Sequence, residues 1–148
     1  MTLFLHFIYS FGAIFFFALV MITPKKAVLP DALIGALGYL IYECIFNFTG
    51  HEIFGYFCGT VFIASAGEIL ARALKMPSII FVFPAVIPLV PGVGLYKTML
   101  TLVENRPQDF MQEGVNTLFI AGTMAISVAL VNVIIRNIPH RKIKKKTN

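Results

Sequence analysis

Prolines and glycines interrupt one long apolar segment, at residues 76–103, where freed backbone groups could bind a ligand. Proline removes a backbone donor and clashes with the preceding helical turn. The segment is therefore expected to contain a half-helix at 78–87, a broken stretch at 88–94 and a second half-helix at 95–103. Free amides and the positive dipole at the start of a half-helix suit an anionic group. The predicted substrate-binding residues are Pro88, Pro91, Gly92, Gly94, Tyr96, Lys97 and Thr98.

The side chains after the break decide what this site could hold. Lys97 would supply a full positive charge, and Tyr96 and Thr98 would supply hydroxyl groups. Broken backbone persists in a membrane only where protein or a water-filled cavity satisfies its polar groups, which favours a binding cavity near the middle of the membrane. The alternative is a kinked helix whose Lys97 side chain snorkels to the outer interface.

Other polar residues inside the apolar segments are candidates for coupling or for the transport pathway. Glu43 has no local partner, so it is interpreted as a proton or cation-coupling site. Glu68 precedes Arg72 by four residues, and an intrahelical ion pair is the alternative to a place in the pathway. Asn116 and Asn132 could either bond across helices or line a pathway.

The remaining reactive residues predict neither catalysis nor a cofactor. Asp31 follows Pro30 at an expected helix start, where a carboxylate favours the helix dipole and a capping role. Cys44 and Cys58 fall in apolar segments and are interpreted as buried side chains. Because the sequence has no Cys/His cluster with metal spacing and no Ser/His or paired-Asp constellation, we expect no metal site and no enzyme.

The composition indicates whether these segments lie in water or in a membrane. The chain has 148 residues, of which 58% are hydrophobic and 13% charged, with a mean hydropathy of +0.85. A soluble domain is about 25% charged, so these values exclude an ordinary soluble enzyme, a disordered tail and a nucleic-acid binder. A membrane helix needs about 20 apolar residues. The sequence predicts an all-α membrane protein with five transmembrane helices, at 3–22, 27–48, 53–71, 76–103 and 114–135.

Lys and Arg residues predict the orientation of these spans. Ten of the twelve lie at the first and third junctions and in the tail at 136–148, and Arg106 alone lies at the other junctions. The positive-inside rule then places the N-terminus outside and the tail in the cytoplasm. A four-span alternative with a re-entrant 76–103 segment would expose the basic tail outside. The expected organisation is a membrane domain at 1–135 and a basic cytoplasmic tail that contacts anionic lipids.

Two stripes of small residues predict close helix packing, because lipid gives helices no hydrophobic reason to associate. The first stripe is Gly55, Gly59, Gly67 and Ala71, and the second is Ala121, Ala125 and Ala129.

The run Pro-Ala-Val-Ile-Pro-Leu-Val-Pro-Gly at 84–92, followed by Tyr96, resembles the signature of the threonine/serine exporter family. The chain is most similar to the family's YjjB-like small membrane subunits. Supporting features are the Pro-Lys-Lys junction at 24–26, the segment at 67–72 and the basic tail.

The resemblance implies a cell-membrane exporter of small solutes that carry a carboxylate: threonine, serine, or dicarboxylates such as succinate. It also implies a larger five-span partner subunit, so that this chain would be half of an inverted-repeat transporter. The expected assembly is a heteromer that can form a higher oligomer. The alternative is a membrane scaffold or regulatory subunit that transports nothing. The break at 88–94 favours transport, since a scaffold would not require it.

Overall fold

The computed structural model describes residues 2–137, and the regular elements of this part of the chain are all helices, without strands. Its elements are α1 (Thr2–Val20), α2 (Lys25–Thr49), α3 (Glu52–Leu74), α4 (Ile79–Val86), a 3₁₀ turn (Ile87–Leu89), α5 (Gly92–Val103) and α6 (Pro107–Asn137). Four helices are long and apolar enough to cross a membrane, and α4 with α5 forms a fifth candidate span that bends by 53°. The predicted all-α membrane fold is confirmed. The basic tail beyond residue 137 lies outside the described residues.

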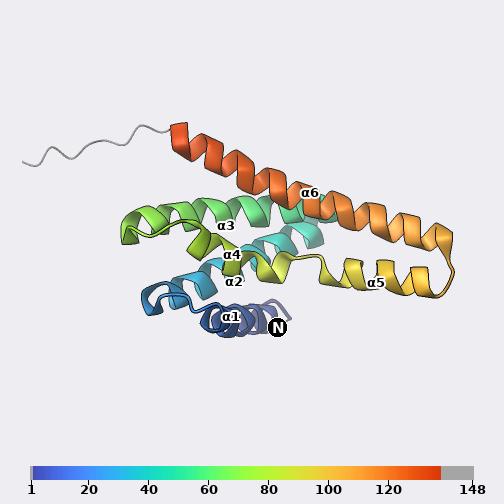
Figure 1. Ribbon diagram of the computed structural model, residues 1–148, viewed down its shortest axis with the longest axis horizontal. Helices are drawn as coiled ribbons and strands as arrows, with labels where there is room; N and C mark the ends of the chain where they lie inside the picture. The colour runs from blue at the N-terminus through green and yellow to red at the C-terminus, as the bar shows by residue number, and fades with distance from the viewer. Residues whose placement is uncertain (1, 138–148) are drawn as a thin grey trace, which may run out of the picture.

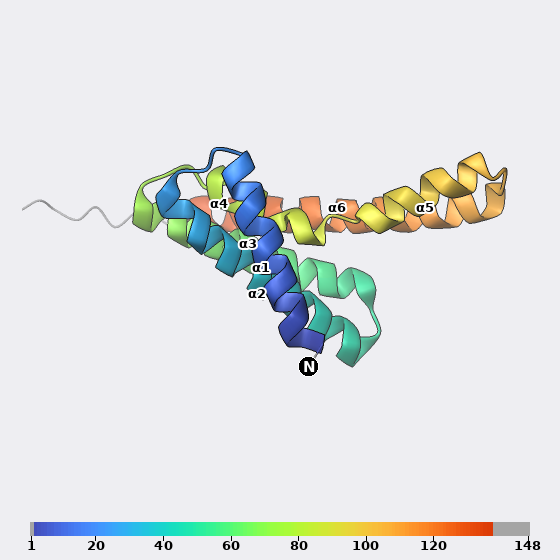
Figure 2. The ribbon, with the colours of Figure 1, turned by 90° about the horizontal axis from the view of Figure 1, so that it is seen from below.

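The helices form a body and an arm. In Figure 1, α1, α2 and α3 lie in chain order, α4 lies between α2 and α3, and α6 crosses α3. Within the described chain, α5 contacts only α6. Figure 2 shows that α5 and the first half of α6 project from the body as a helical hairpin.

The first stripe of small residues forms the packing face of α3, as predicted. A Cβ added at Gly59 would lie 2.8 Å from the carbonyl oxygen of Gly38 in α2, and one at Gly67 would lie 2.7 Å from a methyl group of Val82 in α4. Ile63, which interrupts the stripe, is fully buried where Gly38 leaves room for it. Close approach of the backbones therefore depends on the absence of side chains on both α2 and α3.

The second stripe does not pack inside the described part of the chain, so its packing against another protein stays a prediction. Ala121, Ala125 and Ala129 all lie on the exposed side of α6. The buried side of α6 carries larger residues: Thr117, Ile120, Met124, Ser127 and Val131. Ile120 and Met124 join the main core with Ile34, Ile63, Ala85 and Leu89.

The last helix is longer than the predicted span at 114–135. It begins at Pro107, so the predicted polar loop at 104–113 shrinks to three residues. Proline suits the first helical position, and Asp109 in the first turn suits the dipole. Arg106 holds this turn through ion pairs to Glu104 at 3.2 Å and to Asp109 at 3.3 Å. A helix of 31 residues is about 46 Å long, more than a hydrocarbon core of about 30 Å.

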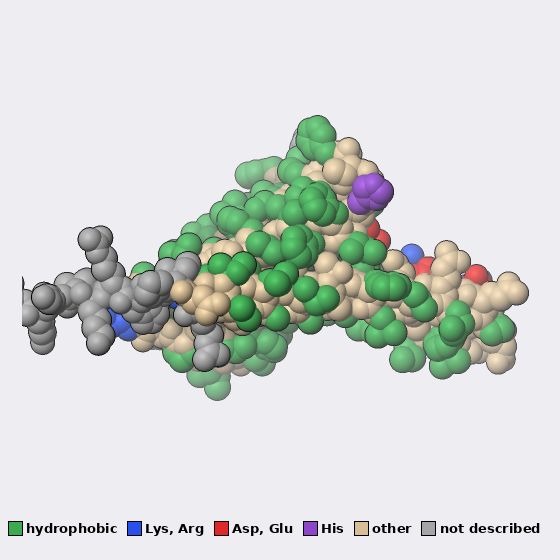
Figure 3. Space-filling view, turned by 90° about the horizontal axis from the view of Figure 1, so that it is seen from above, with side chains coloured by type: hydrophobic (Ala, Val, Ile, Leu, Met, Phe, Trp, Pro, Cys, Tyr) green, Lys and Arg blue, Asp and Glu red, His purple; other side chains and the backbone are tan. Residues whose placement is uncertain are grey.

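The outer surface is apolar. Large hydrophobic side chains are exposed along every long helix, and Figure 3 shows hydrophobic side chains spread over both the body and the arm. Such a surface is stable only against lipid tails or another apolar protein surface.

Candidate substrate cavity at the helix break

The break between α4 and α5 is tighter than predicted. The Val90 amide donates to the Ile87 carbonyl at 3.1 Å, and α5 begins directly after Pro91, with Gly92. The Leu95 amide already donates to the Pro91 carbonyl at 3.0 Å. The amides of residues 95–98, which were expected to be free, are therefore used by the helix. Those of Val93 and Gly94, in the first turn, have no helical acceptor.

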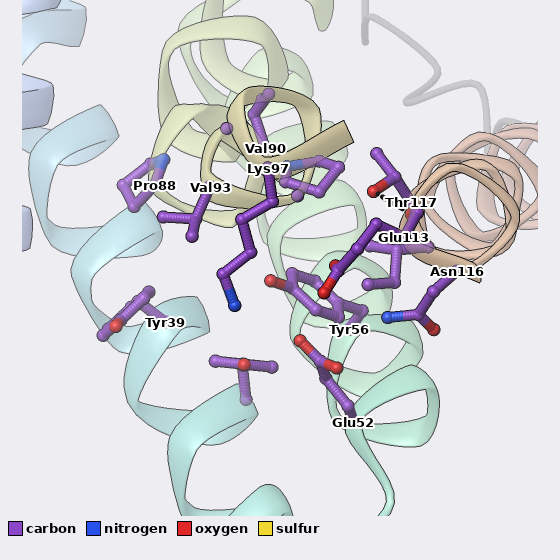
Figure 4. A pocket seen from close by; sticks show the side chains of 15 residues that line it. Tyr39, Glu52, Tyr56, Pro88, Val90, Val93, Lys97, Glu113, Asn116 and Thr117 are labelled. Carbon is purple, nitrogen blue, oxygen red and sulfur yellow. Dashed lines mark hydrogen bonds between the residues drawn. The ribbon is translucent and has the colours of Figure 1, made fainter. Parts of the chain in front are cut away.

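A cavity of about 370 Å³ lies where the arm leaves the body. Its walls come from α2, the start of α3, the break with the first turns of α5, and α6, as Figure 4 shows. The lining residues are Tyr39, Tyr42, Glu52, Tyr56, Pro88, Val90, Pro91, Gly92, Val93, Gly94, Lys97, Glu113, Asn116, Thr117 and Ile120. The volume falls in the lower part of the range of small-molecule sites.

The cavity gathers most, but not all, of the predicted binding residues. Pro88, Pro91, Gly92, Gly94, Lys97 and Asn116 line it. Tyr96 and Thr98 do not. Tyr96 is 65% exposed on another side of α5, and the buried Thr98 hydroxyl donates to the Gly94 carbonyl at 2.8 Å. Neighbouring helical residues point about 100° apart, so Lys97 cannot share its direction with both of them.

Six polar or aromatic residues of the cavity were missed by the sequence analysis: Tyr39, Tyr42, Glu52, Tyr56, Glu113 and Thr117. Their spacing carried a usable signal. Tyr39 and Tyr42, Glu52 and Tyr56, and Glu113 and Asn116 are pairs three or four residues apart, so each pair shares one helix face. The ring centroids of Tyr42 and Tyr56 lie 4.4 Å apart, which joins the α2 and α3 pairs into one wall.

The cavity contains groups of both charge signs. In Figure 4 the Lys97 amine reaches across from α5, while Glu52 and Glu113 lie on the opposite walls. The ion pairs of the described residues involve other side chains, so these three groups are not paired with one another. Unpaired charges in a cavity can bind a ligand that carries both an acidic and a basic group.

Glu43 lies outside the cavity, and although it has no partner nearby in the sequence, it has one on another helix. One carboxylate oxygen pairs with Nδ1 of His6 in α1, and the other is buried without a hydrogen bond. The His6 ring meets the edge of Tyr39, with centroids 6.3 Å apart. Glu43 therefore ties α1 to α2 behind a wall of the cavity.

Glu68 also lies away from the cavity, and it makes no ion pair with Arg72 among the described residues. Arg72 instead donates to the Ile135 carbonyl at 2.8 Å, near the end of α6. Both residues line a separate open hollow that Lys75 and Ser78 border. Free carbonyls at a helix C-terminus attract a cation, which explains why Arg72 binds the end of α6 rather than Glu68.

Groups that could hold a metal ion are missing from the described chain, since no three His, Cys, Asp or Glu side chains come together there. What the cavity offers is hydrogen bonding and charge at a break in a membrane helix. This is the arrangement that transporters use for small charged solutes.

Comparison with known proteins also points to a membrane transporter. An uncharacterized protein of Haemophilus influenzae (strain ATCC 51907 / DSM 11121 / KW20 / Rd) is 30% identical over 122 residues, which cover 77% of this chain and 41% of that protein. The chain thus spans about two fifths of the length of this relative. No solved structure matches. The family model described as "Threonine/Serine exporter, ThrE" matches residues 6–134, so the chain belongs to the threonine/serine exporter family.

Proposed function

We propose that this chain is a subunit of a membrane exporter for small solutes that carry a carboxylate, and that the cavity at the helix break is its substrate site. One observation carries the proposal: the break places Val93 and Gly94, whose amides have no helical acceptor, and Lys97 in the wall of a cavity that Glu52 and Glu113 also line. A scaffold would not require unpaired charges beside broken backbone inside a membrane protein, where each costs several kcal/mol.

The arrangement of charge favours an α-amino acid over a dicarboxylate. A substrate carboxylate would accept hydrogen bonds from the α5 amides and from Lys97. The ammonium group would bind Glu52 or Glu113 on the opposite walls, and a small hydroxylated side chain would fit beside Tyr42 and Tyr56. The second carboxylate of succinate would instead meet these two glutamates and be repelled. Threonine and serine fit the cavity better.

The arm supports a role for a second subunit. Because α5 contacts only α6 within the described chain, its other sides carry exposed apolar residues such as Val93, Leu95 and Met99. The exposed alanine stripe of α6 adds a surface that backbones can approach closely. More than half of the Haemophilus relative lies outside the matched region, which leaves room for another membrane half. The proposed partner is a larger five-span subunit that completes an inverted-repeat transporter.

The distribution of positive charge suggests which side the cavity faces. The cavity lies near the α2–α3 turn, because Glu52 is the first residue of α3, and near the start of α6 at Glu113. With the N-terminus outside and the C-terminus in the cytoplasm of the cell membrane, both of these helix ends are external. In this orientation the cavity lies in the outer part of the membrane rather than at its middle.

The test is export rate against internal substrate concentration for wild type and Lys97→Met at equal protein level, with the partner present. Loss of a hydrogen bond to a charged group costs about 1.5–3 kcal/mol, so apparent affinity should fall roughly ten- to hundredfold. Tyr96→Phe, which alters the neighbouring residue outside the cavity, is the matched control and should leave the curve unchanged.

A second comparison separates the substrate classes. Glu113→Gln should weaken export of threonine while leaving or improving that of succinate, because it removes the charge that recognises ammonium. Identical curves for wild type and Lys97→Met would place Lys97 at the lipid interface. If none of the substitutions in the cavity alters export, the chain is better explained as a scaffold that does not transport.

A further inference from the structure

A second buried carboxylate lies away from the cavity and has no role in it. Asp31 is completely buried, and neither of its carboxylate oxygens has a hydrogen-bond partner. Its expected capping role is wrong, because α2 begins at Lys25 and Asp31 is already in the second turn. Asp31 is the one residue with an ionisable side chain among the fully buried residues of the described chain.

The neighbouring turns of α2 show which helices enclose Asp31. One turn earlier, Ala27 packs with Ala71 of α3 and Phe81 of α4. One turn later, a Cβ added at Gly35 would lie 2.6 Å from the Ala85 carbonyl oxygen, and it would also meet the Ile14 side chain of α1. Residues four apart share a helix face, so Asp31 faces the junction of α1, α3 and α4.

Charged groups on these helices leave Asp31 without a counter-ion. Helix α4 has no titratable residue, and His6 at the far end of α1 is paired with Glu43. Glu68 and Arg72 of α3, and Lys75 directly after it, line the open hollow at the end of the helix. On α2 itself, Lys25 and Lys26 are exposed. None of these groups forms an ion pair with Asp31.

An isolated ionised carboxylate in such a place costs several kcal/mol, whereas the protonated acid costs far less. No group of three or more His, Cys, Asp or Glu side chains that could hold a metal ion occurs in the described chain, so a proton is the simplest ion to neutralise Asp31. We propose that Asp31 is the proton-binding site of the exporter: it holds a proton in this packed conformation and releases it when α2 and α4 separate. The proposal rests on the proposed export function and adds the coupling ion.

The same two helices connect Asp31 to the cavity. Tyr39 follows Asp31 by eight residues on α2, a rise of about 12 Å. Ala85, which contacts Gly35, precedes the cavity residue Pro88 by three positions. A shift of the broken segment against α2 would therefore change the cavity and hydrate Asp31 together. Binding at either site then changes affinity at the other, which is the requirement for coupling.

The end of α2 at Lys25 and Lys26 is the end nearer to Asp31, and we infer that the proton leaves on this side. Asp31 lies six residues into α2 from Lys25, about 9 Å along the axis. Pro30 lies inside the helix and has no N–H, so the Lys26 carbonyl lacks its helical donor. This free carbonyl provides a polar group between Asp31 and the predicted cytoplasmic surface.

Infrared spectroscopy tests the protonation directly, without transport. The chain contains two aspartates, Asp31 and the exposed Asp109. Purified chain labelled with carboxyl-¹³C aspartate should show an isotope-shifted C=O band of a protonated acid at neutral pH. The band should persist in Asp109→Asn and vanish in Asp31→Asn. Its absence from both wild type and Asp109→Asn would show an ionised Asp31 and overturn the proposal.

Transport then tests coupling in vesicles that contain the whole exporter. One proton per solute sustains up to about tenfold accumulation across a gradient of one pH unit. Asp31→Asn should lose this accumulation, with a ratio near one, yet keep exchange of labelled for unlabelled solute, while Asp109→Asn keeps both. Undiminished accumulation by Asp31→Asn, or accumulation driven by sodium alone, would overturn the proposal. Absence of any export by wild type would instead refute the export function, and the infrared band would still decide the proton site.

Discussion

Replacing Gly35 with alanine tests the contact that holds the broken segment against α2. The new Cβ would lie 2.6 Å from the Ala85 carbonyl oxygen and 2.9 Å from its Cα. Both atoms belong to backbone, so a rotamer change cannot relieve the clash, and α2 and α4 must move apart. Overpacking of this kind costs about 1–3 kcal/mol.

A matched control isolates that cost. Gly122 lies inside α6, and a Cβ there would meet nothing within 4 Å. Both substitutions gain about 0.5–1 kcal/mol from replacing a helical glycine, so the difference between the two variants isolates the clash. Gly35→Ala should therefore be about 1–3 kcal/mol less stable than Gly122→Ala.

The assay is thermal unfolding in detergent micelles, followed with a thiol-reactive fluorogenic maleimide. Cys58 in α3 is partly buried, and a Cys44→Ser background removes the exposed thiol. For a chain of this size, 1 kcal/mol corresponds to about 2–4 °C, so a gap of about 2–12 °C is expected. Equal midpoints for Gly35→Ala and Gly122→Ala would refute the close approach of α2 and α4, and with it the proposed link between Asp31 and the cavity.

Further predictions concern topology, the α1–α2 contact and assembly. A reporter fused after Asn148 should read cytoplasmic and one inserted at Gln108 external; finding both on the same side would end the five-span model. A double-mutant cycle of His6→Ala and Glu43→Ala, measured by thermal unfolding, should give a coupling of about 0.5–3 kcal/mol, and additive effects would mean that the pair does not hold α1. Purified alone, the chain should export no solute, and co-expression with a five-span partner should restore export; full activity of a reconstituted monomer would contradict this.

Hydropathy was enough to predict the helices of the body but not where the last one begins. Apolar runs of about 20 residues must become helices in lipid, because no other structure satisfies the backbone there. Hydropathy does not predict the structure of polar residues, and residues 107–113 were predicted as a loop for that reason. Local chemistry decides in favour of helix: Pro107 suits the first position, and Arg106 and Asp109 form an ion pair across the first turn.

The cavity could be predicted in part because proline acts locally. Pro88 and Pro91 break the helix wherever it lies, which brought the break and Lys97 into the prediction. The opposing walls come from α2, α3 and α6, and their positions depend on which faces pack together. The glycine stripe of α3 identified one such face, but the alanine stripe of α6 did not, because Ile120 and Met124 fill the core there. Small size permits close approach without determining which neighbour approaches.

The two acidic residues of α2 show why a buried charge needs its surroundings before it can be interpreted. Sequence alone made Glu43 the coupling candidate and Asp31 a helix cap, since Asp31 follows Pro30 at a basic junction. The structure gives Glu43 a partner in His6, whereas Asp31 is enclosed by Ala27, Gly35 and the helices that contact them. The small residues that allow α1, α3 and α4 to approach α2 also exclude water from Asp31. Tight packing and protonation of Asp31 therefore depend on each other, and a conformational change that relaxes one must alter the other.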